Sequence, residues 1–404
     1  MTAVGAARIT SAQQARTVAA QLATEFAVDA AHRDRDRALP FAEIGTLAAS
    51  GLLAVTVPAA HGGADLPPSE VAEVVRLLAV ADPNIAQIPH SHFVYVNLLK
   101  LAGSADQQRR YLTGVLDGAQ IANAQSERGG ATIADIATTV RPLADGQQFR
   151  IDGVKYYCTG SLFADVLAVL TKLDDPEGTS GLPPGQYVAF LPADTPGVRI
   201  VDDWNGLGQR TTGSGTVSFE GVVVDRDQLV ARTAAVDAPT AYGASAQLLH
   251  AAIDAGIARG ALTAATDFVR DKSRPWFEAQ VARAIDDPLL IQRFGELAVT
   301  VTAAEAALVA AGVAVDAAVD APERVADASI AVASAKILAD RAATEVSSAL
   351  FEVSGTRSAA DDLNLHHFWR NARTHTLHDP VRWKYQHIGR TLLHGTPPPL
   401  HGVI

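Results

Sequence analysis

The chain has 404 residues, which is long enough for two or three domains or for one large layered assembly with a sizeable core. Hydrophobic residues make up 48% of it and charged residues 19%, as in ordinary soluble globular proteins. The formal net charge of -11 disfavours a nucleic-acid partner, because phosphate binding needs a surplus of lysine and arginine.

The cysteine content and the chain start point to a cytoplasmic protein. Cys158 is the one cysteine, which excludes an intrachain disulfide and a metal site built from cysteines. The first residues contain no apolar run followed by a cleavage site, so we expect no signal peptide. The most apolar window, 303–321, is interrupted by Glu305, Asp316 and Asp320, which disfavours a membrane span and favours a closely packed helix.

Three regions of different character follow one another along the chain. In residues 1–120, apolar residues recur at three- and four-residue spacing, which predicts an N-terminal α-helical domain. Residues 121–235 contain short β-rich runs whose connections are too short for crossover helices, which predicts an antiparallel sheet or barrel. In residues 236–404 long helices are expected at 239–272, 286–320, 323–354 and near 380–394. The order predicts an α+β fold of N-terminal helices, a central antiparallel β-domain and a C-terminal four-helix bundle.

The familiar nucleotide-binding motifs are absent. No G-x-G-x-x-G stands between a strand and a helix, and no G-x-x-x-x-G-K is present. The run G-L-G-Q-R-T-T-G leads into the strand T-V-S-F-E, so it is a turn and not a dinucleotide loop. If this protein performs redox chemistry, we expect no nicotinamide site on it.

A segment in the middle of the chain carries a resemblance to a known family. In I-D-G-V-K-Y-Y-C-T-G-S-L-F-A-D, Gly153, Lys155, Tyr157 and Thr159 occupy alternate positions before an Ala-Asp pair. This pattern resembles the strand beside the flavin in the acyl-CoA dehydrogenase superfamily. The run L-G-Q-R-T-T-G-S-G-T-V-S-F-E-G-V-V-V similarly resembles that family's strand pair leaving the β-domain. The similarity extends over nearly the whole chain and implies the fold of that superfamily.

The resemblance implies a flavin beside this strand, held in a flat apolar slot with polar groups near its reactive ring. Thr159 would hydrogen-bond the isoalloxazine edge and Tyr157 would pack near the ring. Asn123 and Ser126, in N-A-Q-S-E, would line the same slot. From the residues alone, Tyr157 reads equally well as a core aromatic, and Thr159 can be an ordinary strand threonine.

Further cofactor contacts are implied later in the chain. Arg274, in D-K-S-R-P-W, stands where the family places an arginine that reaches the flavin phosphate of a neighbouring subunit. A guanidinium fork suits phosphate oxygens, although a solvated arginine at a helix end is the alternative. Ser354 and Gly355 correspond to a glycine pair that approaches the cofactor's pyrophosphate, and Ser354 departs from the pattern expected for FAD.

The dehydrogenases of this family need a carboxylate base, and neither of its two positions carries a glutamate here. Asp379 stands at one position, one methylene shorter and followed by proline. We expect Asp379 to cap the final helix, with Pro380 as its first residue. His250 stands at the other position. The sequence therefore disfavours dehydrogenation.

The stretches R-T-H-T-L-H-D-P, D-W-N-G-L-G-Q-R-T-T-G-S-G-T and Q-L-L-H-A-A-I-D-A-G resemble a different branch on this fold. That branch contains flavin-dependent monooxygenases typified by dibenzothiophene monooxygenase, together with sulfur-acquisition oxidoreductases. The resemblance implies that His378 is the proton donor, since histidine titrates near working pH. It also implies a catalytic set of His378, His375, His92 and Thr159, and a substrate pocket lined by Trp204 and His250.

The histidines have simpler interpretations as well. Of His90 and His92, in P-H-S-H-F, we expect one to be structural. His375 and His378 with Asp379 form a thin ligand set, so we expect no metal site.

The resemblance thus implies a two-component monooxygenase that takes reduced FMN from a separate NAD(P)H:flavin reductase and oxygenates a small organosulfur compound. We expect a homotetramer with neither a nucleic-acid nor a membrane partner. The alternatives are an FAD-dependent acyl-CoA dehydrogenase that uses Asp379, and a flavin-binding protein without turnover.

Overall fold

The computed structural model describes residues 5–401. Residues 1–4 and 402–404, which belong to the expected first and third domains, lie outside the described residues. The N-terminal region is helical, as expected, and its helices are α1 (Ala12–Ala27), α2 (Ala30–Asp36), α3 (Phe41–Ala49), α4 (Pro68–Ala81), α5 (Pro83–Gln87), α6 (His90–Ala102) and α7 (Ala105–Leu116). Local sequence explains several helix starts. Ser104 and Gln107 form a reciprocal capping box at α7, and Pro68 stands in the first turn of α4.

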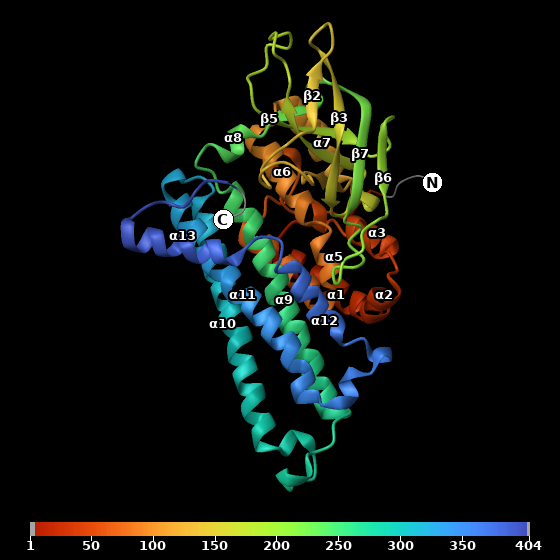
Figure 1. Cartoon of the computed structure of the whole chain (residues 1–404), viewed down its shortest axis with the longest axis vertical. Helices are drawn as coiled ribbons and strands as arrows, with labels where there is room; N and C mark the ends of the chain where they lie inside the picture. The colour runs from red at the N-terminus through yellow and green to blue at the C-terminus, as the bar shows by residue number, and fades with distance from the viewer. Residues whose placement is uncertain (1–4, 402–404) are drawn as a thin grey trace.

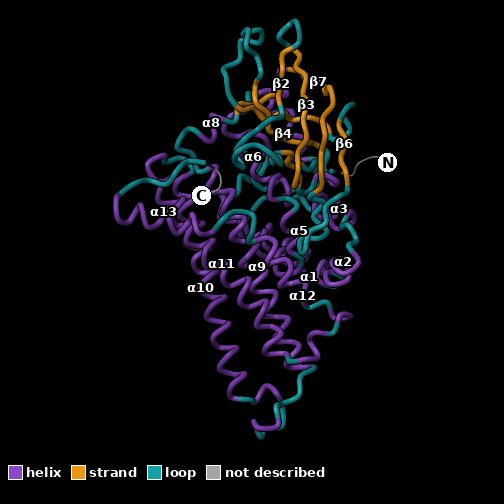
Figure 2. The backbone as a smooth tube through the Cα atoms, viewed as in Figure 1, coloured by secondary structure: helices purple, strands orange, loops and turns teal. Residues whose placement is uncertain are grey.

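The central region is one twisted sheet, drawn in orange in Figure 2. Its strands are β1 (Ile121–Ala124), β2 (Thr139–Pro142), β3 (Gln148–Cys158), β4 (Val166–Leu173), β5 (Gln186–Pro192), β6 (Val198–Val201), β7 (Gly215–Asp225) and β8 (Leu229–Ala231). Their order is β6-β7-β3-β2-β4-β5-β8, and β1 pairs with β4.

The expectation of a purely antiparallel sheet was wrong at one strand. β4 pairs in parallel with both β1 and β2, while the remaining pairings are antiparallel. The chain achieves this without a crossover α-helix, because it runs from β2 back along the antiparallel strand β3 before it enters β4. β2 and β8 are too short, at four and three residues, to stand out as periodic runs.

After the short α8 (Thr233–Val236), the C-terminal region is helical. Its helices are α9 (Tyr242–Asp271), α10 (Pro288–Ala318), α11 (Val325–Ser354), α12 (His366–His375) and α13 (Val381–His394). The three long helices run side by side away from the sheet, and α13 lies across them near their sheet-proximal end (Figure 1). Most of α9 is buried, because α4, α10 and α11 all pack against it.

Helix α10 is long and apolar enough to cross a membrane, with a mean hydropathy of 1.9 over its best 18-residue window. The charged residues that interrupt its apolar sequence are paired with other parts of the chain, however. Glu305 pairs with Arg76 and Arg259, and Asp316 accepts hydrogen bonds from Ser69. The face turned away from the buried residues of the helix is exposed and apolar, with the large exposed side chains Leu289, Ile291, Val299, Val309 and Val313. This outer face lacks a covering element among the described residues.

Two features of the β-domain bring its end close to the helices. A Cβ at Gly208, in the loop 202–214, would lie 2.0 Å from the carbonyl oxygen of Arg370, so only glycine lets this loop rest on α12. Lys155 is fully buried, and its ammonium binds Glu127 at 2.6 Å, which fastens the segment after β1 to β3. The sheet end, α5 and α12 therefore meet in one place.

Candidate active site

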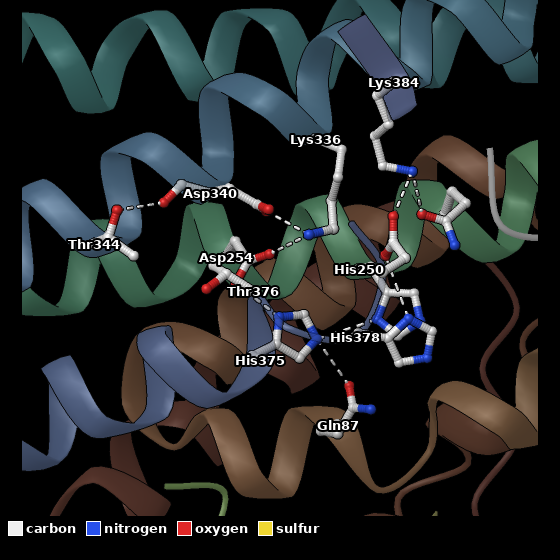
Figure 3. Close-up of polar contacts among 12 residues, drawn as sticks. Gln87, His250, Asp254, Lys336, Asp340, Thr344, His375, Thr376, His378 and Lys384 are labelled. Atoms are coloured by element: carbon white, nitrogen blue, oxygen red, sulfur yellow. Dashed lines mark hydrogen bonds and ion pairs between the residues drawn. The ribbon is translucent and has the colours of Figure 1, made fainter. Parts of the chain in front are cut away.

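Four histidines from separate elements converge between α6, α9 and α12. The ring of His250 stacks on His90 at a centroid distance of 3.9 Å and lies 3.8 Å from the ring of His378. Its Nδ1 lies 3.1 Å from Nε2 of His375 (Figure 3). His90, His250 and His375 are buried, whereas the side chain of His378 is 41% exposed. His378 is thus the member of this histidine cluster that a ligand can reach.

Burial keeps the inner histidines neutral. It lowers the pKa of His90 to about 3 and the pKa values of His250 and His375 well below their usual range. Repulsion among the neighbouring imidazoles acts in the same direction. These rings therefore act as neutral donors and acceptors, with tautomers set by their partners.

Behind the histidines lies a buried charged group that sequence analysis missed. Asp254 Oδ1 is 2.7 Å from His375 Nδ1, and Asp254 Oδ2 is 3.0 Å from the ammonium of Lys336. Lys336 also binds Asp340, one turn further along α11. Burial opposes charge on Lys336, but the two carboxylates outweigh it and raise its pKa. The spacing of Lys336 and Asp340 at i and i+4 in the apolar run S-A-K-I-L-A-D was the available signal.

Asp379 does not have the role expected from the sequence. Helix α13 begins at Val381 with Pro380 as its N-cap residue, and no side chain caps it. Instead, the carboxylate of Asp379 lies 2.7 Å from the ammonium of Lys384 and 3.3 Å from Nδ1 of His378. Burial favours the neutral acid, but the His378 hydrogen bond and the nearby lysines outweigh it and hold the pKa well below its usual range. Asp379 is a buried counter-ion.

The structure places His92 outside the histidine cluster, and His90 is the histidine of P-H-S-H-F that lies in it. The ring of His92 is fully buried and both nitrogens are occupied by backbone groups. Its Nε2 lies 2.8 Å from the carbonyl oxygen of Leu53, and its Nδ1 accepts from the N–H of Ile121 at 3.1 Å. His92 therefore joins the N-terminal helices to the sheet, whereas His90, two residues earlier, faces the cluster.

The expected flavin residues gather at the end of β3. Tyr157 has a φ of 58°, a conformation uncommon for side chains larger than glycine, and it is 47% exposed. Its ring meets Trp204 edge-on at 6.2 Å, and the guanidinium of Arg128 lies 5.1 Å from the ring centre. The hydroxyl of Thr159 pairs with that of Ser214 at 2.8 Å. These side chains form a partly open aromatic and hydroxyl-bearing surface.

Unpaired polar atoms lie beside this surface. Asn123 Oδ1 is buried and has no hydrogen-bond partner within residues 5–401, and the same holds for both amide atoms of Gln120 and of Gln209. Ser126, by contrast, is exposed and pairs through its backbone with Tyr156. Buried polar atoms without partners are rare in folded proteins, so several here indicate groups awaiting a ligand.

Arg274, Ser354 and Gly355 lie far from these residues in the same chain. Ser273 donates to the carbonyl oxygen of Ser354 at 3.4 Å, so the three residues share one end of the bundle. Arg274 is exposed, and the hydroxyl of Ser354 is buried without a partner within the described chain. At 1.5 Å per helical residue, that end is about 30 Å along α9 from His250.

A cavity of about 480 Å³ lies between α6 and α9, and none of the four clustered histidines lines it. Phe93, Val94 and Leu249 give it apolar walls, and Ala246 also lines it. The carbonyl oxygen of Ala246 is 3.0 Å from Nε2 of His90. Within residues 5–401, no group of three or more His, Cys, Asp or Glu side chains is arranged to hold a metal ion.

Comparisons with known proteins agree over most of the chain. Residues 10–119, 122–222 and 248–383 match the N-terminal, middle and C-terminal domains of acyl-CoA dehydrogenase. The dibenzothiophene monooxygenase of Rhodococcus qingshengii is 32% identical over 395 residues, which cover 94% of this chain and 93% of that protein. The probable FMNH2-dependent monooxygenase SfnC of Pseudomonas putida is 31% identical, with 96% and 97% covered.

Among solved structures, FMN-bound TdsC from Paenibacillus sp. A11-2 is similar with a TM-score of 0.90 and 34% identity. The match covers 96% of this chain and all of that chain. The chain therefore belongs to the acyl-CoA dehydrogenase family, in the branch of flavin-dependent monooxygenases that includes dibenzothiophene monooxygenase.

Proposed function

We propose that this chain is the oxygenase of a two-component system, acting in the cytoplasm. A separate NAD(P)H:flavin reductase supplies reduced FMN, and this chain uses it with O2 to oxygenate a small organosulfur compound. The named relatives act as dibenzothiophene monooxygenase or as an FMNH2-dependent monooxygenase, and one similar structure holds FMN.

The observation that carries the proposal concerns the two positions where a dehydrogenase would have its carboxylate base. Neither offers a free carboxylate here, and imidazoles lie at this place instead. Removing a proton beside a thioester needs an unpaired carboxylate facing the ligand. Asp379 is only 4% exposed and is bound to Lys384 and His378, so it does not supply one. His378 instead presents a partly exposed ring whose Nδ1 is held by Asp379, which leaves Nε2 for a ligand.

The residues at the sheet end fit a flavin. Asn123 and Gln120 offer buried polar atoms without partners, which suit the hydrogen-bonding edge of an isoalloxazine ring. Tyr157 and Trp204 offer aromatic surface, and the Thr159 hydroxyl stands at the same edge. Reduced FMN with O2 supplies the oxygen atom and the electrons when it is bound. The chain binds and orients it, excludes water, and holds a proton at His378.

The cavity between α6 and α9 has room for a small organosulfur substrate. Its apolar walls at Phe93, Val94 and Leu249 suit a thiophene or alkyl sulfur compound, and charged side chains, among them Lys100 and Asp316, line it as well. The carbonyl oxygen of Ala246, which lines the cavity, contacts His90.

A phosphate site completed by a second copy accounts for the distant Arg274. Its guanidinium and the free hydroxyl of Ser354 suit a phosphate, yet they lie about 30 Å along α9 from His250. The exposed apolar face of α10 gives a second copy a surface to cover. We therefore include a homotetramer in the proposal, with each flavin held by two chains.

The test is rapid mixing of the purified protein with reduced FMN under anaerobic conditions, followed by oxygen. The expected result is a transient absorbance that differs from both reduced and oxidised FMN and lasts many times longer than in free solution. A His378→Ala variant is expected to shorten its lifetime at least tenfold. The matched control is His32→Ala, since His32 is an exposed histidine in the N-terminal domain.

Immediate reoxidation of FMN, with no difference between the protein and buffer, would contradict the proposal. A purified protein that contains FAD and reduces a dye with acyl-CoA would replace it by the dehydrogenase reading, and Asp379→Ala would then abolish dye reduction.

A further inference from the structure

The buried charged group behind the histidines has more carboxylates than cations. Among residues 5–401, the ammonium groups paired with Asp254, Asp340 and Asp379 are those of Lys336 and Lys384. Once His378 has given up its proton, three carboxylates against two ammonium groups leave one negative charge in an interior that strongly disfavours it. One additional proton balances the group.

The carboxyl pair offers a place for that proton. Asp254 and Asp340 are joined through Lys336, and all three side chains are buried between α9 and α11. Burial, together with the neighbouring carboxylate of Asp254, raises the pKa of Asp340 to about 8. Two carboxyl groups that share one site keep one proton between them near neutral pH.

A path of hydrogen bonds leads from this pair toward the site. Asp254 Oδ1 lies 2.7 Å from His375 Nδ1, and His375 Nε2 lies 3.1 Å from His250 Nδ1 (Figure 3). Gln87 Oε1 lies 3.2 Å from the same Nε2 and, as an acceptor, favours the His375 tautomer that carries its proton on Nε2. The path ends at the His250 ring, 3.8 Å from the ring of His378.

From this arrangement we propose that Asp254 and Asp340 store one proton in the bundle and that His375 relays it to His250. The store replaces the proton that His378 gives up, so the inference rests on the proposed function. Asp254, Asp340, Lys336 and His375 are positioning residues in this scheme, because none of them touches the ligand.

The relay balances in protons. At the start, Asp254 carries the proton on Oδ1, and His375 and His250 each carry one on Nε2. The Asp254 proton passes to His375 Nδ1, the His375 Nε2 proton passes to His250 Nδ1, and the His250 Nε2 proton passes to His378, which has given up its own and whose ring centre lies 3.8 Å away. At the end, the ionised carboxylate of Asp254 faces the ammonium of Lys336, and both histidines are in the Nδ1–H form.

Other titratable groups face the path from every packed element. They are His90 on α6, His378 and Asp379 after α12, Lys384 on α13, and Lys336 and Asp340 on α11. Burial keeps His90 neutral, and the Asp379–Lys384 pair is internally balanced. Burial raises the pKa of both Asp254 and Asp340, so the pair keeps its proton at lower pH and releases it as the pH rises.

The experiment uses the flavin-free protein. Infrared spectra of the wild type are expected to show a protonated buried carboxyl at pH 6.5 that is lost by pH 9.5. Ring ¹⁵N signals, assigned through His375→Gln, are expected to move His375 from the Nε2–H to the Nδ1–H form over the same range. Asp340→Asn is expected to remove the carboxyl signal and keep His375 as Nδ1–H throughout.

Matched variants separate the store from general effects. Asp327→Asn, an exposed aspartate on the same helix, is expected to keep both signals, and Asp340→Glu is expected to restore them. A wild type without a protonated carboxyl at pH 6.5, or with one fixed His375 tautomer, would overturn the inference without any variant.

A second readout tells this inference apart from the proposed function. In rapid mixing, Asp340→Asn is expected to lower the rate of substrate oxygenation at least tenfold at pH 7 and not at pH 9.5, where the store is empty in both proteins. Equal rates at pH 7 would overturn the relay and leave the monooxygenase intact. Loss of the FMN transient in every protein, with the infrared and tautomer changes present, would instead remove the proposed function.

Discussion

Replacing Lys336 by methionine tests whether the buried cation stabilises the bundle. Lys336 is fully buried and bridges Asp254 and Asp340. Methionine keeps most of the volume but leaves two buried carboxyl groups without their cation. Breaking a buried pair in this way costs about 3–5 kcal/mol, because the remaining charge is uncompensated.

The loss is expected to depend on pH with a defined sign. Without Lys336, the folded-state pKa values of Asp254 and Asp340 rise further above the unfolded values, so the folded variant binds an extra proton. A raised pKa gives stability below the unfolded value that is lost as the pH rises through the folded value. The deficit relative to wild type therefore grows from pH 6 to pH 8, by up to about 1.4 kcal/mol per pH unit.

The assay is urea unfolding followed by tryptophan fluorescence at pH 6, 7 and 8. Lys100→Met is the matched control, since the Lys100–Asp65 pair is partly exposed and worth at most about 1 kcal/mol. A Lys336→Met deficit below about 1 kcal/mol, or one that is the same at all three pH values, would refute the reasoning.

Three further outcomes are expected. His92→Ala should lower the unfolding free energy by about 1–3 kcal/mol for each backbone group left unpaired and spare the FMN transient, whereas His90→Ala should shorten the transient with less effect on urea unfolding. Asn123→Ala should weaken FMN binding by about 2- to 13-fold in fluorescence titration without lowering the melting temperature, because the free Oδ1 stabilises nothing in the protein alone. Val313→Asp, in the outer face of α10, should lower the molar mass measured by light scattering, and an unchanged mass would contradict a second copy covering that face.

Much of the fold followed from the sequence, because long periodic segments leave little choice. The helices expected at 239–272, 286–320 and 323–354 are found at Tyr242–Asp271, Pro288–Ala318 and Val325–Ser354. Flanking prolines and glycines mark such ends well. The parallel pairing of β4 was not predictable, because sequence spacing reports which runs are strands and not which neighbour each one finds.

Residues of the candidate site could be predicted only where they lie in a recognisable sequence motif. The stretch R-T-H-T-L-H-D-P pointed to His375 and His378, which the structure brings together with His250. Which of His90 and His92 lies in the cluster depends on the phase of the helix, because side chains two positions apart point to opposite sides. The spacing of Lys336 and Asp340 gave only a weak signal, because a lysine in an alanine-rich run is usually solvent-exposed and its buried partner on α9 is not evident from the sequence.

Helix α9 would connect two flavin sites in the proposed tetramer. Near its start it carries His250 and Asp254, and just beyond its end the chain reaches Arg274. In a tetramer where Arg274 contacts the flavin phosphate of a neighbouring subunit, α9 connects the histidines of one site to the phosphate contact of another. Rods of buried helix transmit displacement rather than absorb it. In such a tetramer, flavin binding at one site would change the flavin affinity of the next site, so the four sites would not fill independently.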